Sequence, residues 1–319
     1  MLFPRTVIKI LMPSVTFVGK VLRALPSAGG EGVRSLILAN ECGYVRAFFY
    51  DEKVELLDGI NVGDVLLIEN AYVGKKATKT IRVGKYAKVK KLDLDVKALR
   101  DVRATYITTL AVARPESNHV CVAGIDEHGN WLRLQSIYEE DIFSHGGSEP
   151  NFRNFYVSKV YVDEWHGRNP RLEDRFFIFG EGVVRELNDE EKKKFLEEHL
   201  DRSVDAVFKS GRTLGLIKPK ILRAYEDRRR GGRSYGQYIK FDFRDGTGRL
   251  FRRWSCRCLA FYDFWNDFKR QKRLFFGYRM LRFLRKHDVY FCIGLTHSDY
   301  GFKNLEYGAF PMVVGVHVI

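Results

Sequence analysis

The residues of this chain that could do chemistry gather in one basic and aromatic stretch, residues 249–286. It holds twelve arginines and lysines but only two acidic residues, Asp263 and Asp267, so it carries a net charge of +10 out of the chain's +14. Eleven aromatic residues are interleaved with these cations. Guanidinium groups match the geometry of phosphates and stack on bases, and aromatic rings offer platforms on which any base can stack. The stretch therefore indicates a polyanionic partner, with nucleic acid as the first candidate.

The aromatic residues of this stretch also fit an ordinary protein core. Phe261, Phe264 and Phe268 follow the i, i+3, i+7 spacing of a helix face that packs inward. The arginines need another explanation, because a solvated protein surface normally mixes charges of both signs. We expect residues 250–262 to form a strand and residues 263–286 to form a basic helical insertion whose cations face outward.

The sequence shows no constellation of residues typical of an active site. It lacks the P-loop, the dinucleotide-binding GxGxxG and the zinc-binding HExxH patterns. Its eight histidines have no ligand spacing, and its five cysteines form no CxxC pair. We interpret the acidic residues of 163–166 and the pair Glu173 and Asp174 as surface charges, although a metal-dependent nuclease can draw its acids from distant strands. We expect no catalysis, no cofactor and no bound metal.

The composition predicts a soluble, cytoplasmic protein. No run of 18 apolar residues is present, and the apolar N-terminal segment is interrupted by Arg5, Lys9 and two prolines. The odd number of scattered cysteines does not resemble a disulfide framework, which is consistent with a reducing compartment.

Residues 1–91 have the pattern of a small closed barrel. Runs with strand character cover residues 15–25, 33–40, 44–50, 64–73 and 80–91. Residues 51–59, between the third and fourth runs, predict one short helix, and five strands with a helix in that position form the plan of an OB-fold. The segment GYVRAFFYDEKVELLDGINVGDVLLIENAYV resembles the OB-folds of replication protein A and related single-strand binders. The resemblance implies a nucleic-acid-binding face on this barrel.

The third run shows which residues would form that face. Tyr44, Arg46, Phe48 and Tyr50 alternate with residues that would fill the barrel, so the four share one side of the strand. An alternative is that Phe48 and Tyr50 pack beneath a neighbouring domain. Further candidates on this barrel are basic or aromatic residues of strands one and five and of the loop between strands four and five: Lys20, Lys75, Lys76, Lys79, Arg82, Tyr86 and Lys88.

A charged linker, residues 92–103, precedes a second barrel predicted over residues 104–187. The segment LAVARPESNHVCVAGIDEHGNWLRLQ resembles the start of the dual-OB domain family, and NPRLEDRFFIF and the C-terminal GAFPMVVGVHVI resemble its later elements. The resemblance implies two OB-like barrels in tandem and brings no catalytic residues with it. Trp131 and Arg133 share one face of a predicted strand, which makes them candidates for nucleic-acid contact.

A third OB-like barrel is predicted over residues 201–319, after a connecting helix over residues 188–200. That helix has Asn188 and Glu191 in capping-box positions. Strands are expected at residues 214–225 and 238–243, joined by a basic, glycine-rich loop that could order on a phosphate backbone or remain an exposed hairpin tip. The candidates in this loop and in the basic stretch are Arg228, Arg229, Arg230, Arg233, Tyr235, Arg252, Arg253, Trp254, Lys269, Arg270, Lys272, Arg273, Arg279, Arg282, Arg285 and Lys286.

These patterns together predict a mainly β protein of three OB-fold-like five-stranded barrels in tandem, with short helices and one basic helical insertion. We expect a non-catalytic nucleic-acid-binding protein that favours structured or single-stranded RNA. Its most concrete form is a ribosome-associated factor that binds ribosomal RNA on a subunit and blocks functional sites, as in translation silencing or hibernation. The alternatives are a single-stranded DNA-binding protein of replication or repair, a metal-dependent nuclease, and a protein-interaction scaffold.

Overall fold

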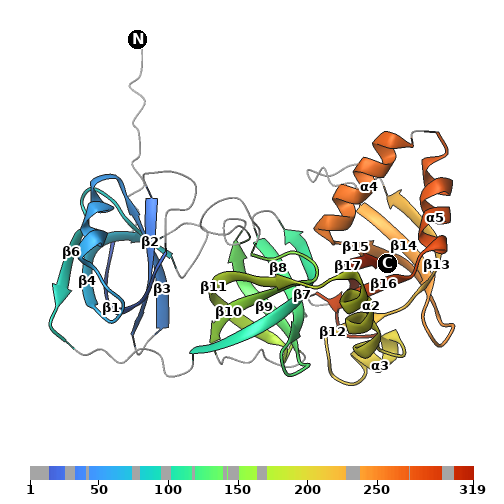
Figure 1. The fold of residues 1–319 in the computed structure, drawn as a ribbon, viewed down its shortest axis with the longest axis horizontal. Helices are drawn as coiled ribbons and strands as arrows, with labels where there is room; N and C mark the ends of the chain where they lie inside the picture. The colour runs from blue at the N-terminus through green and yellow to red at the C-terminus, as the bar shows by residue number, and fades with distance from the viewer. Residues whose placement is uncertain are drawn as a thin grey trace, which may run out of the picture. The chain divides into compact units, whose positions relative to one another are not determined.

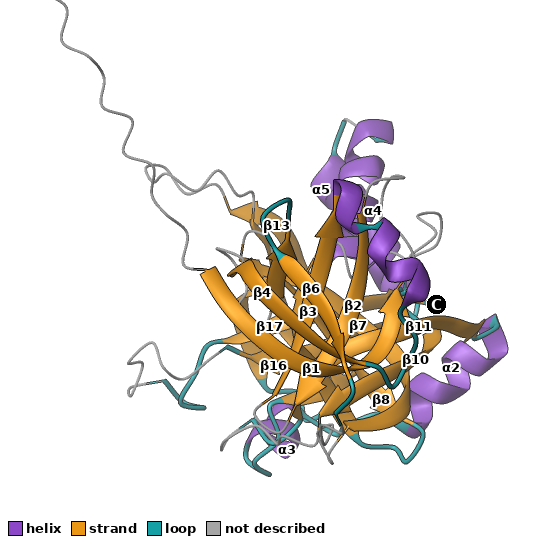
Figure 2. Ribbon diagram, turned by 90° about the vertical axis from the view of Figure 1, so that its left-hand side faces the viewer, coloured by secondary structure: helices purple, strands orange, loops and turns teal. Residues whose placement is uncertain are grey.

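The computed structural model describes residues 14–25, 33–40, 43–73, 80–94, 102–116, 119–138, 142, 151–163, 171–227, 238–272, 274–296 and 305–319. These residues are mainly β-strands (Figures 1 and 2). They divide into two compact units, one up to residue 102 and one from residue 103 onward. Most of the predicted linker, residues 95–101, and the loops at 74–79 and 228–237 lie outside the described part of the chain.

The first unit is a closed five-stranded barrel. Its strands pair in the order β1-β2-β3-β5-β4, and β4 pairs back onto β1. This order confirms the OB-fold plan expected from the sequence. The elements are β1 (Ser14–Leu25), β2 (Val33–Asn40), β3 (Gly43–Tyr50), η1 (Asp51–Lys53), η2 (Glu55–Gly59), β4 (Val65–Val73), β5 (Thr80–Val83) and β6 (Lys88–Leu92).

Two details of this barrel differ from the prediction. The expected strand at residues 80–91 is divided by a turn at residues 84–87 into β5 and β6, which both pair with β4, at Tyr72↔Arg82 and Ile68↔Val89. The expected helix at residues 51–59 consists of two 3₁₀ helices. Neither difference changes which strand faces point inward.

The second unit begins with another closed barrel, with the strand order β7-β8-β9-β11-β10. A tight turn joins β8 to β9: Gly129 has a φ of 82°, and the Asp126 carboxylate accepts hydrogen bonds from the backbone N–H groups of His128 and Asn130. The strands are β7 (Val102–Glu116), β8 (His119–Asp126), β9 (Trp131–Tyr138), β10 (Tyr156–Asp163) and β11 (Asp174–Glu186).

Helix α2 (Asp189–Glu198) follows the second barrel and begins as predicted. The Asn188 side chain accepts a hydrogen bond from the Glu191 N–H, and the Glu191 carboxylate accepts one from the Asn188 N–H, each at 2.9 Å. Such a capping box satisfies two N–H groups that a helix start otherwise leaves unpaired. A shorter helix, α3 (Val204–Phe208), precedes the last sheet.

The last part of the chain forms a six-stranded mixed sheet with the order β12-β16-β17-β15-β14-β13. Within the described residues, β12 and β13 are its two edges, so closure into a third barrel is not part of the observed pairing. Helices α4 and α5 lie together beside the sheet (Figure 1). The elements are β12 (Leu214–Ile217), β13 (Lys220–Asp227), β14 (Tyr238–Arg244), β15 (Leu250–Cys256), α4 (Leu259–Gln271), α5 (Phe276–Lys286), β16 (Val289–Leu295) and β17 (Pro311–Val318).

The boundaries predicted for the basic stretch were partly wrong. The strand expected over residues 250–262 ends at Cys256, and α4 begins at Leu259, four residues before the predicted insertion. The residues 259–262 are helical because Phe261 continues the same inward face as Trp265, and both are buried in the aromatic core of this sheet. The two helices connect β15 to β16, just as the 3₁₀ helices connect the third and fourth strands of the first barrel.

A shared core joins the second barrel to the last sheet. Leu110 and Ile125 of the barrel, Leu196 of α2, and Leu214 and Tyr290 of the sheet belong to one buried cluster. Burial of side chains from all three elements in a single core makes this unit one packed body.

Candidate nucleic-acid interface

A groove of about 610 Å³ crosses the surface of β13, β14 and β15 on the side opposite the core. Arg223 and Tyr225 occupy alternate positions of β13, and Arg252 and Arg253 occupy two adjacent positions of β15. The lining residues are Leu222, Arg223, Tyr225, Asp227, Asp242, Leu250, Arg252 and Arg253. The arrangement combines guanidinium groups with one aromatic ring, which is the composition suited to phosphate contact and base stacking.

A β-bulge explains how two consecutive arginines both reach the groove. Phe241 pairs with Trp254 and Phe243 pairs with Phe251, so Asp242 alone lies opposite both Arg252 and Arg253. Arg253 has a φ of 59°, and its backbone N–H donates to the Asp242 carboxylate at 2.8 Å. The extra residue interrupts the alternation of the strand. Both arginines are therefore exposed, while the residues on either side of them are buried or half-buried.

Two carboxylates pair with two of the three cations of the groove. Asp242 lies 3.8 Å from the guanidinium of Arg223, and Asp227 lies 3.4 Å from that of Arg253. The Arg223 guanidinium also stacks over the Tyr225 ring, 4.9 Å from its centroid. Burial and, to a lesser extent, the nearby Asp242 charge raise the pKa of Tyr225, so its phenol stays neutral. Arg252 makes no ion pair with the described residues and is exposed.

Sequence reasoning placed Arg252 and Arg253 near a binding face but missed Arg223 and Tyr225. The signal was present in the sequence: Arg223, Tyr225 and Asp227 stand two residues apart and therefore share one face of a strand. Trp254 is not part of the groove, because the bulge turns it into the core, where it is 6% exposed and packs against Phe243.

The outer face of the first barrel carries a second set of aromatic and cationic residues. Residues Ala47 and Phe49 fill the barrel, and Tyr44, Arg46, Phe48 and Tyr50 are on the opposite side of β3, as the alternation predicts. Tyr44 and Arg46 are only 7% and 9% exposed, so they offer little surface to a ligand. Arg46 instead stacks over Phe48, with its guanidinium carbon 4.7 Å from the ring centroid, and donates to the Ser35 hydroxyl.

The accessible part of this first-barrel face is smaller than predicted. Phe48 and Tyr50 are half-buried, and Arg82 pairs with Phe48 across the parallel strands β3 and β5 and is exposed. Tyr86 is 72% exposed in the turn after β5. Lys20 is half-buried on β1, and Lys88 is exposed on β6. The lysines at 75, 76 and 79 lie outside the described residues.

Trp131 and Arg133 are not surface residues, contrary to the prediction. Trp131 is 8% exposed in the shared core. Arg133 is 5% exposed and donates to the Asp174 carboxylate and to the Thr213 hydroxyl, both at 2.9 Å. Their strand is covered by β12, so the face that the sequence suggested for a ligand is occupied by the chain itself.

The carboxylate pair Glu173 and Asp174, interpreted from sequence as surface charge, belongs to the same buried network. Glu173 accepts hydrogen bonds from the N–H groups of Thr213 and Leu214, at 2.5 and 3.3 Å. Arg171 donates a hydrogen bond to the Leu295 carbonyl at 2.7 Å. Burial and, to a lesser extent, the Arg133 charge lower the pKa of Arg171 to about 10. These groups connect the second barrel to β12 and β16. Their role is therefore structural.

The basic residues of α4 and α5 divide into paired and unpaired cations. Lys269 binds Glu226 at 2.6 Å, Arg270 pairs with Asp267, and Arg285 donates to the backbone carbonyls of Ile221 and Leu222. The remaining predicted cations are exposed: Lys272, Arg279, Arg282 and Lys286. Arg273 lies outside the described residues, as do the loop candidates Arg228, Arg229, Arg230, Arg233 and Tyr235.

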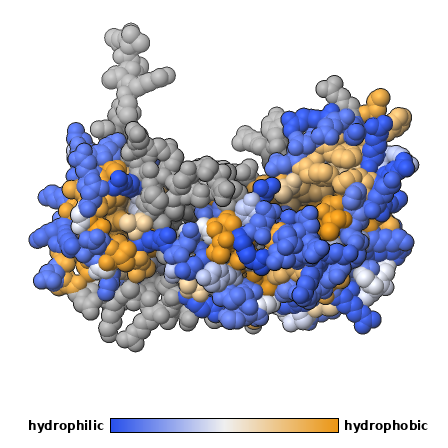
Figure 3. Space-filling model, viewed as in Figure 1, coloured by the Kyte–Doolittle hydropathy of each residue, from blue (hydrophilic) through white to orange (hydrophobic). Residues whose placement is uncertain are grey.

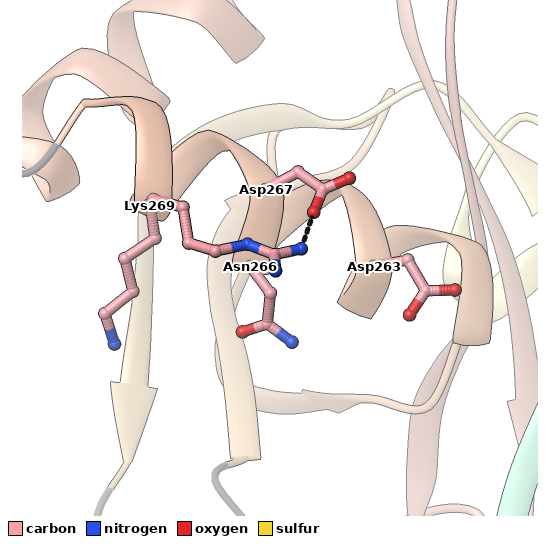
Figure 4. A pocket seen from close by; sticks show the side chains of 5 residues that line it. Asp263, Asn266, Asp267 and Lys269 are labelled. Carbon is pink, nitrogen blue, oxygen red and sulfur yellow. Dashed lines mark hydrogen bonds and ion pairs between the residues drawn. The ribbon is translucent and has the colours of Figure 1, made fainter.

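A hollow of about 770 Å³ lies along α4 and mixes charges of both signs. Figure 4 shows Asp267 joined to the Arg270 guanidinium, with Asp263 further along the helix and Lys269 extending away from both. Asp263 and Asp267 stand one helical turn apart. The hollow has two acidic residues against two basic ones, whereas the groove has three arginines against two aspartates, so the hollow suits an anionic partner less well than the groove.

The described residues contain no cluster of three or more histidine, cysteine or acidic side chains placed to hold a metal ion. Of the acidic residues noted in the sequence at 163–166, Glu164 lies outside the described part of the chain. No described helix is long and apolar enough to cross a membrane.

No family model and no curated protein matches the sequence. Among solved structures, the OB domain of MM0293 from Methanosarcina mazei is 18% identical and is matched over 28% of this chain and 84% of its own, with a TM-score of 0.24. A replication protein A heterotrimer bound to ssDNA is 10% identical over 100% of this chain and 96% of its own, with a TM-score of 0.27. A murine DNA binding protein bound with ds DNA is 10% identical over 55% of this chain and 99% of its own, with a TM-score of 0.31.

These TM-scores are too low to serve as an argument. The resemblance of the chain to OB-fold proteins rests on its own two closed barrels, in which the first strand pairs with the second and the fifth lies between the third and fourth.

Proposed function

We propose that this protein binds single-stranded nucleic acid, and single-stranded DNA in particular, along the groove of β13, β14 and β15. The observation that carries the proposal is the set of three exposed arginines, Arg223, Arg252 and Arg253, around the ring of Tyr225. The cations would track the phosphates, and a base would stack on the tyrosine or on the Arg223 guanidinium.

The hydrogen-bonding groups of the groove favour DNA over RNA as the first ligand to test. A protein distinguishes RNA through contacts to the 2′-hydroxyl, and carboxylates are natural acceptors for it. Asp242 already accepts the Arg253 N–H and lies 3.5 Å from the Tyr225 hydroxyl, and Asp227 is paired with Arg253 and Lys240. The carboxylates of the groove are thus engaged within the protein. The ribosome-associated role suggested by charge gains no support from this geometry.

We further propose that the last sheet is an OB-like barrel whose first strand is divided. β12 and β13 are separated only by Lys218 and Pro219, and a proline cannot donate a ladder hydrogen bond. If the two count as one strand, the order becomes that of the other two barrels, with β12 pairing with β16 and β13 with β14. The amides of β12 and β13 should then exchange with solvent as one cooperative unit, and much faster exchange in β12 would argue against a divided strand.

Fluorescence anisotropy tests the binding proposal directly. Labelled oligo-dT, oligo-rU and a blunt DNA duplex are titrated with the full chain at several salt concentrations. We expect the tightest binding to oligo-dT, with affinity that falls as salt rises. Tight binding to ribosomal RNA fragments with none to oligo-dT would reject the DNA assignment.

The same proposal treats the protein as a binder without catalysis. Incubation of labelled DNA and RNA with the protein and Mg²⁺ or Mn²⁺ should leave both intact. Cleavage that is lost on chelation would establish the nuclease alternative instead.

A further inference from the structure

The connection between α4 and α5 exposes an apolar tip, formed by Leu274, Phe275 and Tyr278. Their side chains are 74%, 78% and 68% exposed, and Leu274 and Phe275 are the most exposed large hydrophobic residues in the described chain. Figure 3 shows hydrophobic atoms at this end of the helix pair, next to hydrophilic ones. Exposed apolar residues grouped in this way mark an interaction site more often than a feature of the fold.

The backbone at Phe275 gives a second, independent reason to look for a ligand. Phe275 has a φ of 55° and a ψ of 29°, the left-handed region that favours glycine or asparagine. It stands at the start of α5, where its side chain makes no capping hydrogen bond. Neither backbone conformation, nor capping, nor burial favours phenylalanine here. A strained residue that the fold does not require is a reason to propose a function for its side chain.

The cations next to the tip are arranged along one side of α5. Tyr278, Arg279, Arg282 and Lys286 fall within one sector of the helix, and the three cations are exposed and make no ion pair with the described residues. From Tyr278 to Lys286 the helix rises roughly 12 Å, which corresponds to about three or four base pairs of duplex. An unpaired row of positive charge beside aromatic rings fits an anionic polymer whose end offers a flat apolar face.

This row of cations adjoins the groove. Arg285 of α5 donates to the Ile221 and Leu222 carbonyls, at 3.2 and 2.9 Å, and Leu222 lines the groove. Helix α5 therefore packs against the edge strand β13, with its C-terminal end beside Leu222.

We propose, on the basis of the single-strand binding proposed above, that the protein recognises the junction between a single strand and a duplex. The single strand occupies the groove, the phosphates of the duplex contact Arg279, Arg282 and Lys286, and the ring of Phe275 stacks on the terminal base pair. The tip thus acts as a wedge at the end of the duplex.

Anisotropy with three matched DNAs tests this inference: a single strand, the same strand annealed at one end to give a tailed duplex, and a blunt duplex. One added stacking contact corresponds to roughly a 5- to 100-fold gain in affinity, so the wild-type chain should bind the tailed duplex that much more tightly than the single strand. Phe275→Gly should abolish this preference and leave single-strand affinity within about twofold. Because glycine adopts the left-handed conformation without strain, the melting temperature of the Phe275→Gly variant should not fall below that of the wild type. Tyr106→Ser, which removes an exposed aromatic of β7, is the control and should change neither value.

Several outcomes would overturn the inference, and they are distinguishable. Equal affinity of the wild type for single strand and tailed duplex rejects junction recognition but leaves the groove proposal standing. Junction recognition is also rejected if the Phe275→Gly variant still prefers the tailed duplex over the single strand. The same holds if the variant loses only the ability to bind phosphatidylserine vesicles, a result that would identify the tip as a lipid contact. Absence of binding to any single strand rejects the proposed function and the inference together.

Discussion

Arg253 offers a sharp test of the groove, because its substitution by glycine separates binding from stability. Its φ of 59° is strained for arginine and natural for glycine. Relief of that strain is worth about 1 kcal/mol or more, while the added freedom of glycine in the unfolded chain costs about 0.4–1 kcal/mol. The variant also loses the ion pair with Asp227. Because the Arg253 side chain is 71% exposed, this pair contributes only about 0–1 kcal/mol to stability. We therefore expect Arg253→Gly to change the free energy of unfolding by no more than about 1 kcal/mol.

The effect on binding should be larger and dependent on salt. Each phosphate contact to a single strand contributes about 0.7 to the slope of log affinity against log salt, or roughly fivefold in affinity at 0.1 M salt. Arg253→Gly should remove one such contact. Combining it with Arg252→Gln should lower the slope by about 1.4 and the affinity roughly 25-fold at the same salt.

Anisotropy with oligo-dT at five or six salt concentrations gives the slopes, and urea denaturation gives the stabilities. Lys194→Gln is a matched control, because Lys194 is an exposed cation of α2 whose nearest carboxylate, on Glu198, is 3.7 Å away. An Arg253→Gly slope equal to that of the Lys194→Gln control would mean that the groove does not contact phosphate, and the proposed function would lose its main support.

Three further predictions follow from other parts of the molecule. Phe48→Ala should weaken oligo-dT binding by about 1–3 kcal/mol if bases also stack on the first barrel, and an unchanged affinity in the same titration would show that this face takes no part. Asp174→Asn should destabilise the chain by about 3–5 kcal/mol in urea denaturation because it leaves the buried Arg133 cation uncompensated, a result that a loss below 1 kcal/mol would contradict. Hydrogen bonds from Lys209, the largest cause, and from Tyr307 lower the pKa of Asp205 from 3.8 to about 2. The ionised carboxylate therefore stabilises the fold above pH 4, and that contribution is lost as the pH falls towards 2. The melting temperature of Asp205→Asn should accordingly depend less on pH between 4 and 2 than that of the wild type, and parallel curves would refute the assignment.

Local sequence patterns correctly predicted the strand faces of the first barrel and the start of α2. The alternation around Phe48 identified the inward and outward faces of β3, and the Asn188–Glu191 spacing identified the start of α2. Both signals depend on residues within a few positions of each other, so the sequence contains all the information that they need.

The sequence failed where distant segments meet. Trp131 and Arg133 have the alternation of a ligand face, but β12, about eighty residues later, covers them, and no local pattern announces that. The bulge at Arg252 and Arg253 likewise depends on pairing with Asp242 of the neighbouring strand. Burial by remote segments and cross-strand register decide which cations of a basic protein remain available to a partner.

The buried network around Arg133 has a consequence for how this protein can be divided. Arg133 and Glu173 of the second barrel hydrogen-bond to Thr213 and Leu214 at the start of the last sheet, and Asp174 pairs with Arg133. The shared hydrophobic cluster also contains residues of both parts. A fragment that ends near residue 200 would expose that cluster to solvent and would leave Arg133 and Glu173 without their partners in the last sheet. Residues 103–319 should therefore melt in a single cooperative transition. The groove and the second barrel are, in folding terms, one inseparable module.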